Sequence, residues 1–71
     1  MKASINDIQQ QITKCLTQFK TADEYNINHW CGFPHQFASA LAALVESGNV
    51  VEVVRHGRFG ILVRYKLNAQ G

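Results

Sequence analysis

Apolar positions between residues 37 and 45 recur with the period of an α-helix. They fall at spacings of four, three and one, and they are Phe37, Leu41, Leu44 and Val45. This spacing puts them on one face of a helix. Pro34 suits the first helical position because its missing N–H would be unpaired there in any case, and Gly48 is a typical C-terminal stop. The pattern therefore predicts a helix over residues 34–47.

The opposite face of this predicted helix has an unusual composition. The residues on this face are His35, Ser39, Ala42 and Glu46, and Gln36 and Ala43 lie beside them. A solvated helix face usually carries Lys and Glu, whereas these side chains are mostly short and nearly uncharged. Short side chains let a neighbouring surface approach the helix backbone closely. The face therefore indicates contact with a DNA groove or with another protein.

Helical periodicity also covers the N-terminal part of the chain. Ser4, with Asp7 three residues later, is a variant of the capping box that opens a helix. The apolar positions that follow at helical spacing are Ile5, Ile8, Ile12, Cys15, Leu16 and Phe19. The pattern predicts a helix over residues 5–19.

A second, shorter helix is predicted over residues 22–31. Thr21 and Glu24 match the Thr-x-x-Glu capping box. The residues expected to turn inward are Ala22, Tyr25 and either Ile27 or Trp30 with Cys31. Gly32 can adopt the left-handed conformation that ends a helix, and the proline after Phe33 favours an extended conformation there. Only about three residues then separate this helix from the next, which is the helix-turn-helix arrangement.

After the third predicted helix the pattern changes to that of β-strands. Residues 50–55 are rich in β-branched side chains, and residues 61–67 end in alternating apolar and polar positions. Two glycines lie between the runs, so together they predict a β-hairpin. The residues expected to face the helices are Ile61, Val63, Tyr65 and Leu67, with Leu62, Arg64 and Lys66 outside. Valines on both faces of the first strand leave its register open. The elements predict an α+β fold of three helices and a two-stranded antiparallel hairpin.

Length and composition place the chain among small globular proteins. Its 71 residues are predicted to form one domain, residues 1–71. No apolar run approaches the roughly 20 residues that a membrane helix needs, and the N-terminal residues lack the apolar core of a signal peptide. We therefore expect a cytoplasmic protein whose two cysteines are reduced thiols. The net charge of +2 permits DNA binding without favouring it.

The sequence contains no motif that is typical of an enzyme or of a metal site. Paired carboxylates, a glycine-rich phosphate loop and a nucleophile with an ordered base are all missing, so we expect no enzyme and no cofactor. The residues of metal-ligating type are Cys15, His29, Cys31 and His35. Their spacing matches no structural zinc pattern, and both cysteines occupy positions where the helical period requires core residues. We therefore expect no metal site.

The aromatic residues near the two predicted turns have alternative interpretations. Trp30, Phe33 and Phe37 could form a platform on which bases stack. They could also pack the second helix onto the third, which the statistics of protein cores favour. Phe59 lies between glycines in the predicted hairpin loop, and it could contact a partner or fold back over the hairpin.

The order of elements, helix, helix, turn, helix and hairpin, resembles the winged helix-turn-helix domain. The resemblance covers about residues 4–67, and the segments that carry it are residues 21–24, Gly32, residues 40–50 and Tyr65-Lys66-Leu67. In size the chain is similar to the small bacterial and phage regulators of this fold, including the fimbrial-operon regulators. The resemblance implies a transcription regulator that binds double-stranded DNA.

In that family the third helix lies in the major groove, and the wing touches the DNA backbone or the minor groove. The residues of this chain that would meet base edges or phosphates from the third helix are His35, Gln36 and Ser39. Those at the wing tip are Arg55, His56 and Arg58. A Gln side chain suits adenine through two hydrogen bonds, and a Ser hydroxyl suits several partners.

One departure from the family pattern leaves a second hypothesis open. Residues 34–47 contain no Arg or Lys, and Glu46 adds a negative charge. Because phosphate neutralisation supplies much of the affinity for DNA, a monomer with this helix should bind weakly. The alternative is a winged-helix module that contacts another protein or a second copy and does not bind DNA itself.

Overall fold

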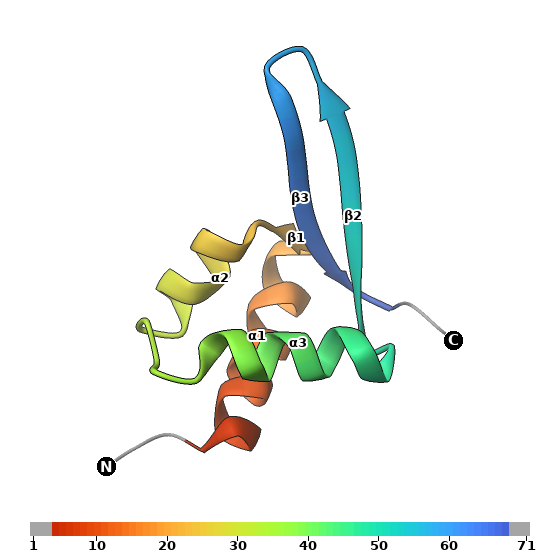
Figure 1. Cartoon of the computed structure of the whole chain (residues 1–71). Coiled ribbons are helices and arrows are strands. Elements are labelled where there is room, and N and C mark those ends of the chain that lie inside the picture. Colours follow the sequence, from red (N-terminus) through yellow and green to blue (C-terminus); the bar gives the residue numbers. More distant parts are fainter. Residues whose placement is uncertain (1–3, 69–71) are drawn as a thin grey trace.

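The computed structural model describes residues 4–68, which contain three α-helices and three β-strands. In chain order they are α1 (Ile5–Phe19), β1 (Thr21–Ala22), α2 (Glu24–Trp30), α3 (Phe37–Ser47), β2 (Val50–Gly57) and β3 (Gly60–Leu67). Figure 1 shows the helices gathered in one body, from which β2 and β3 project as a long hairpin. The predicted α+β class is confirmed, but the antiparallel sheet has three strands rather than two.

The core lies where the helices meet the base of the sheet. Its largest fully buried side chains belong to Ile12, Leu16, Ile27, Val50 and Cys15. The buried residues of α3 are Phe37, Ala40, Leu41 and Leu44. The faces that α1 and α3 bury are therefore those that the helical spacing predicts. At the two ends of the α1 stripe, Ile5 and Phe19 remain 39% and 52% exposed.

α2 begins later than predicted, and its N-cap is Asp23 rather than Thr21. The Asp23 side chain accepts a hydrogen bond from the backbone N–H of Asn26 at 2.8 Å. Thr21 instead lies in β1, where a β-branched residue is favourable, and Asp is at least as good a cap as Thr. Tyr25, which was expected to turn inward, is 67% exposed. Ile27, fully buried, takes the inward position of this short helix.

The end of α2 combines one expected and one unexpected backbone conformation. Gly32 is left-handed as expected, with φ 81°, but Phe33 has φ 52° instead of an extended conformation. The N–H of Gly32 donates to the carbonyl oxygen of His29 at 3.0 Å, and the N–H of Phe33 donates to that of Asn28 at 2.9 Å. These two bonds form a Schellman motif, which satisfies carbonyl groups at the helix end. The hydrogen bonds thus outweigh the preference that the following proline imposes on Phe33.

The same ending moves the start of α3. α3 begins at Phe37 rather than at Pro34, so the connection spans residues 31–36 and is longer than the predicted turn. The carbonyl oxygen of Pro34 accepts a hydrogen bond from the N–H of Phe37 at 3.2 Å. Gln36 is the N-cap of α3, and its side chain makes no capping hydrogen bond. The two helices are therefore joined less tightly than in the predicted helix-turn-helix.

The sheet has the strand order β1-β3-β2, and both pairs of strands are antiparallel. In the first pair, Thr21 lies opposite Lys66 and Ala22 lies opposite Tyr65. A strand of two residues is too short to show an alternating pattern, so the sequence does not predict β1. This pairing connects the segment between α1 and α2 to the base of the hairpin.

β2 and β3 are longer than predicted and are joined by a two-residue turn, Arg58-Phe59. Their register places Val54 opposite Val63 and Gly57 opposite Gly60. Side chains alternate between the two faces of a strand, so one face of the hairpin looks toward the helices and the other away from them. The face that looks away, called the outer face below, carries Val51, Val53, Arg55, Leu62, Arg64 and Lys66.

The hairpin runs past the helical body (Figure 1), and exposure on its helix-facing side changes accordingly. Near the base, Val50 is 1% exposed and Tyr65 is 8% exposed. Ile61 lies on the same side of β3 but is 63% exposed, because it is close to the tip. The prediction that Ile61 packs against the helices is therefore wrong, although its strand face is the expected one.

Substitution of Asp23 and Thr21 tests which residue caps α2. Asp23→Ala removes the acceptor of the Asn26 N–H and should lower the free energy of unfolding by about 1 kcal/mol. Thr21→Val, the matched control, keeps a β-branched residue in β1 and should change it by less than about 0.5 kcal/mol. Urea unfolding followed by circular dichroism measures both values. A larger loss for Thr21→Val would show that Thr21 is the cap.

A pair of Ile→Ala substitutions tests the position of the core. Ile27→Ala empties a fully buried site and should lower the free energy of unfolding by about 2–5 kcal/mol. Ile61→Ala removes the same atoms from an exposed site near the hairpin tip and should cost less than about 1 kcal/mol. The same urea titrations provide the comparison, and equal losses would contradict the burial of Ile27.

Candidate nucleic-acid interface

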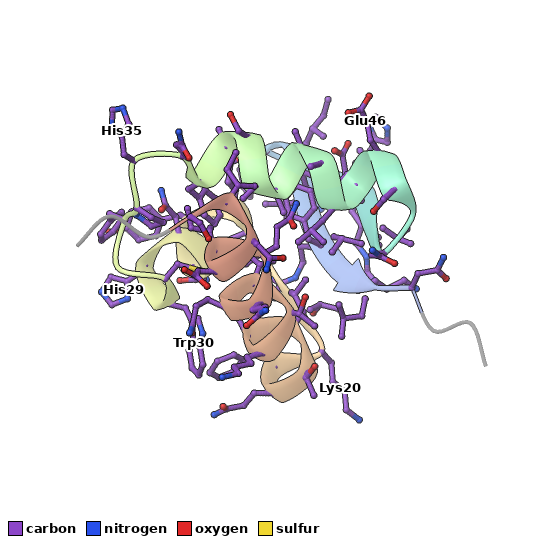
Figure 2. All side chains as sticks on the ribbon, turned by 90° about the horizontal axis from the view of Figure 1, so that it is seen from below. Lys20, His29, Trp30, His35 and Glu46 are labelled. Atoms are coloured by element: carbon purple, nitrogen blue, oxygen red, sulfur yellow. The ribbon has the colours of Figure 1, made fainter. Side chains whose placement is uncertain are left out.

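The exposed side of α3 carries one group of the predicted contact residues. Ser39, Ala42 and Glu46 are exposed on the helix. His35 and Gln36 are also exposed, but they lie in the connection before α3 and not on the helix itself. Figure 2 shows His35 and Glu46 on the same side of the molecule, at opposite ends of α3. A stripe of mostly short side chains runs between them.

The second group of predicted contact residues lies at the distal end of the hairpin. Arg55 and His56 are in β2 and Arg58 is in the turn, and all three are exposed. The register places Arg55 opposite Leu62 on the outer face, and His56 opposite Ile61 on the helix-facing side. Arg55 and His56 are adjacent in β2 but point to opposite faces, so a partner that lies against one face of the hairpin contacts only one of them.

The structure adds Arg64 and Lys66, which the sequence does not assign to the site. Both are exposed on the outer face together with Arg55. Arg55 and Arg64 are diagonal neighbours across the two strands, which corresponds to about 7–8 Å between their Cα atoms. The other side chains of this face are apolar and belong to Val51, Val53 and Leu62. Strand alternation predicts that Arg64 and Lys66 point outward, but only the register brings Arg55 beside Arg64.

Positive charge is concentrated on the hairpin. Of the six Lys and Arg residues within residues 4–68, those on the hairpin are Arg55, Arg58, Arg64 and Lys66. Glu52 is the one carboxylate of β2 and β3, and it lies opposite Tyr65 on the helix-facing side. Four cations against one carboxylate give the hairpin a formal charge of +3, compared with +2 for the whole chain. A polyanion would therefore be attracted to the hairpin more than to α3.

Two groups of exposed aromatic side chains lie around α2. Phe19 and Trp30 meet edge to face with ring centroids 5.4 Å apart. The second group, with centroids between 5.5 and 6.5 Å apart, consists of Tyr25, His29 and Phe33. The favoured interpretation of Trp30 and Phe33 as packing between α2 and α3 is wrong, because they are 39% and 52% exposed. Of the three aromatic residues considered together, only Phe37 is buried.

The two cysteines are free thiols with raised pKa values. Cys15 is buried and Cys31 is half-buried. Burial raises the pKa of each thiol, and interaction with Cys15 raises the pKa of Cys31 further. A raised pKa disfavours the thiolate, which is the form that binds a metal ion. Within residues 4–68, the structure brings together no group of three His, Cys, Asp or Glu side chains that could hold a metal ion.

Comparison of the chain with models of protein families, with curated proteins and with solved structures finds no match. In the part of the chain that the structure describes, no helix has both the length and the apolar character needed to cross a membrane.

The state of the thiols can be tested with a thiol reagent such as DTNB. At about pH 8 a raised pKa leaves less thiolate than a free cysteine has, so both residues should react slowly in the native protein. Cys15 should be the slower one, because it is 1% exposed. Rates for Cys15→Ala and Cys31→Ala separate the two thiols. Reaction of Cys15 as fast as in urea-unfolded protein would contradict its burial.

Proposed function

We propose that this protein is a small winged-helix regulator that binds double-stranded DNA through α3 and the hairpin. The proposal rests above all on the outer face of the hairpin, where Arg55, Arg64 and Lys66 lie without a carboxylate among them. The order of the elements, three helices followed by a long hairpin, supports the winged-helix assignment.

The two contact elements have different roles in this proposal. The cations of the hairpin neutralise phosphates, which gives affinity without sequence information. On the side of α3, Gln36 and Ser39 offer an amide and a hydroxyl that can hydrogen-bond base edges. Ala42 lets the helix approach the groove closely. His35, at the start of the same stripe, can bond to a phosphate or a base.

The charge distribution limits the affinity of a single copy. With one phosphate contact for each of the four hairpin cations, log K would fall against log salt with a slope of roughly −3.6. Binding would then weaken roughly 100-fold between about 50 and 200 mM salt. Glu46 on α3 opposes the approach of phosphates, so α3 adds selectivity more than affinity. A second copy on a neighbouring half-site would raise the affinity.

A protein-interaction role is the second candidate, and exposed apolar residues at the hairpin tip favour it. Phe59 is 98% exposed and does not fold back over the hairpin. Ile61 and Leu62 follow it and are each 63% exposed. Single exposed apolar residues are common, but a group of them is typical of a contact surface. In this alternative the tip docks on a second copy or on another protein.

A salt titration with matched variants tests DNA binding. Arg55→Gln should weaken the binding of a mixed-sequence duplex several-fold at low salt, because one phosphate contact is lost. The salt slope should become shallower by about 0.9. Lys14→Gln removes the same charge from α1 and should change the affinity by less than about twofold. Fluorescence anisotropy at several salt concentrations gives both quantities.

Two results would decide against the proposal. Absence of binding to any duplex at low salt would exclude DNA as the partner. Equal losses for Arg55→Gln and Lys14→Gln would show that net charge, and not the hairpin face, is responsible. The second candidate instead requires that the protein does not bind DNA. Where the partner is a second copy, it also requires a dimer in sedimentation equilibrium that Phe59→Ser dissociates.

A further inference from the structure

A cavity of about 340 Å³ opens where α1, β1, α2 and β3 meet. The buried residues in its lining are Cys15 and Ala22, so its inner part is mainly apolar. Of the residues assigned to the proposed DNA interface, only Arg64 lines it. Contact of α3 and the hairpin with DNA therefore does not account for this cavity.

Two aromatic side chains form part of the cavity wall. Phe19 and Trp30 both line it and meet edge to face, with an angle of 84° between their ring planes. Phe19 is 52% exposed and Trp30 is 39% exposed, so core packing does not explain why aromatic residues occupy these two positions. Figure 2 shows Trp30 on the outside of the molecule, beside the C-terminal end of α1. A flat ring that enters the cavity would gain contact with both aromatic side chains.

Arg64 brings a positive charge to the same cavity. Its Nη2 group donates a hydrogen bond to the carbonyl oxygen of Thr21 at 3.3 Å, which orients the guanidinium from β3 toward β1. A guanidinium has five N–H donors, and the bond to Thr21 is the one it makes within the described residues. Among the described residues that line the cavity, none is Asp or Glu. The cavity thus presents a cation that still has donors for a partner.

We propose that this cavity binds a small planar anion, namely an aromatic ring that bears a carboxylate. The carboxylate pairs with Arg64, whose planar donors match two carboxylate oxygens. The ring lies against Phe19 and Trp30, and the side chain of Asn26, which also lines the cavity, can bond to a ring substituent.

The size of the cavity sets the size of the ligand. Ligand sites usually measure about 300–1,000 Å³, and the cavity, at about 340 Å³, is near the lower limit. It therefore accepts one ring with short substituents. The proposal can be tested separately from DNA binding, because within residues 4–68 Arg64 is the one residue of the proposed DNA interface that lines the cavity.

The single tryptophan of the chain gives a direct readout of binding. In the ¹⁵N-labelled full-length chain, the indole N–H of Trp30 gives one separate NMR signal. Benzoate should shift this signal along a saturable curve, with half-saturation at roughly millimolar concentration as expected for so small a ligand. Benzamidine has the same shape but the opposite charge, and it should produce no saturable shift.

Two matched variants locate the charge that selects the anion. Arg64→Gln should weaken benzoate binding about tenfold or more, since a charge-assisted hydrogen bond is lost. Lys66→Gln removes the same charge from the same face of β3 outside the cavity, and it should change binding by less than about twofold. Absence of a saturable benzoate shift would overturn the proposal. Equal binding of benzamidine, or equal effects of the two substitutions, would also overturn it. The comparison of benzoate with benzamidine decides the question even if Arg64→Gln does not fold.

Discussion

The pairing of Thr21 and Ala22 with β3 determines the geometry of much of the molecule. Ala22 and Tyr65 lie opposite each other on the buried side of the sheet, which fixes the base of the hairpin against the helices. Because the two residues of β1 are held in a strand, the cap of α2 falls at Asp23. The same pairing brings Arg64 within hydrogen-bonding distance of the Thr21 carbonyl and so completes one side of the cavity.

Shape and charge are divided between two parts of the protein. α3 offers a stripe of short side chains with the single charge of Glu46, whereas the hairpin offers the cations. Arg64 belongs both to the outer face of the hairpin and to the lining of the cavity. A carboxylate bound there would withdraw one cation from a phosphate backbone. Two ligands that share Arg64 in this way would each weaken the binding of the other by the same factor, as thermodynamic linkage requires.

The parts of the fold that the sequence predicts are those that local periodicity controls. α1 spans the predicted residues 5–19, because a long apolar stripe allows only one helical face to be buried. Thr21 is favourable both as a helix cap and as a strand residue. Its pairing with β3, which is distant in the sequence, places it in a strand. Phe33 follows the hydrogen bonds of the helix end rather than its own preference. Arg55 and Arg64 are neighbours only because of the strand register. The sequence does not predict this register, because the first strand has valines on both faces. The cavity joins four separate elements, which no local pattern reveals.

The hairpin is held to the body at one end only. At Tyr65 and Lys66, β3 lies between two partner strands, whereas toward the tip it has one partner and an open edge. Local opening costs least free energy where few apolar contacts are lost. Backbone amides should therefore exchange their hydrogens faster from Tyr65 toward Phe59, and those at the base, where β3 has two partner strands, should exchange most slowly. A hairpin held in this way can bend and twist at its tip against the surface of a partner, while its paired base fixes the direction in which it leaves the helices.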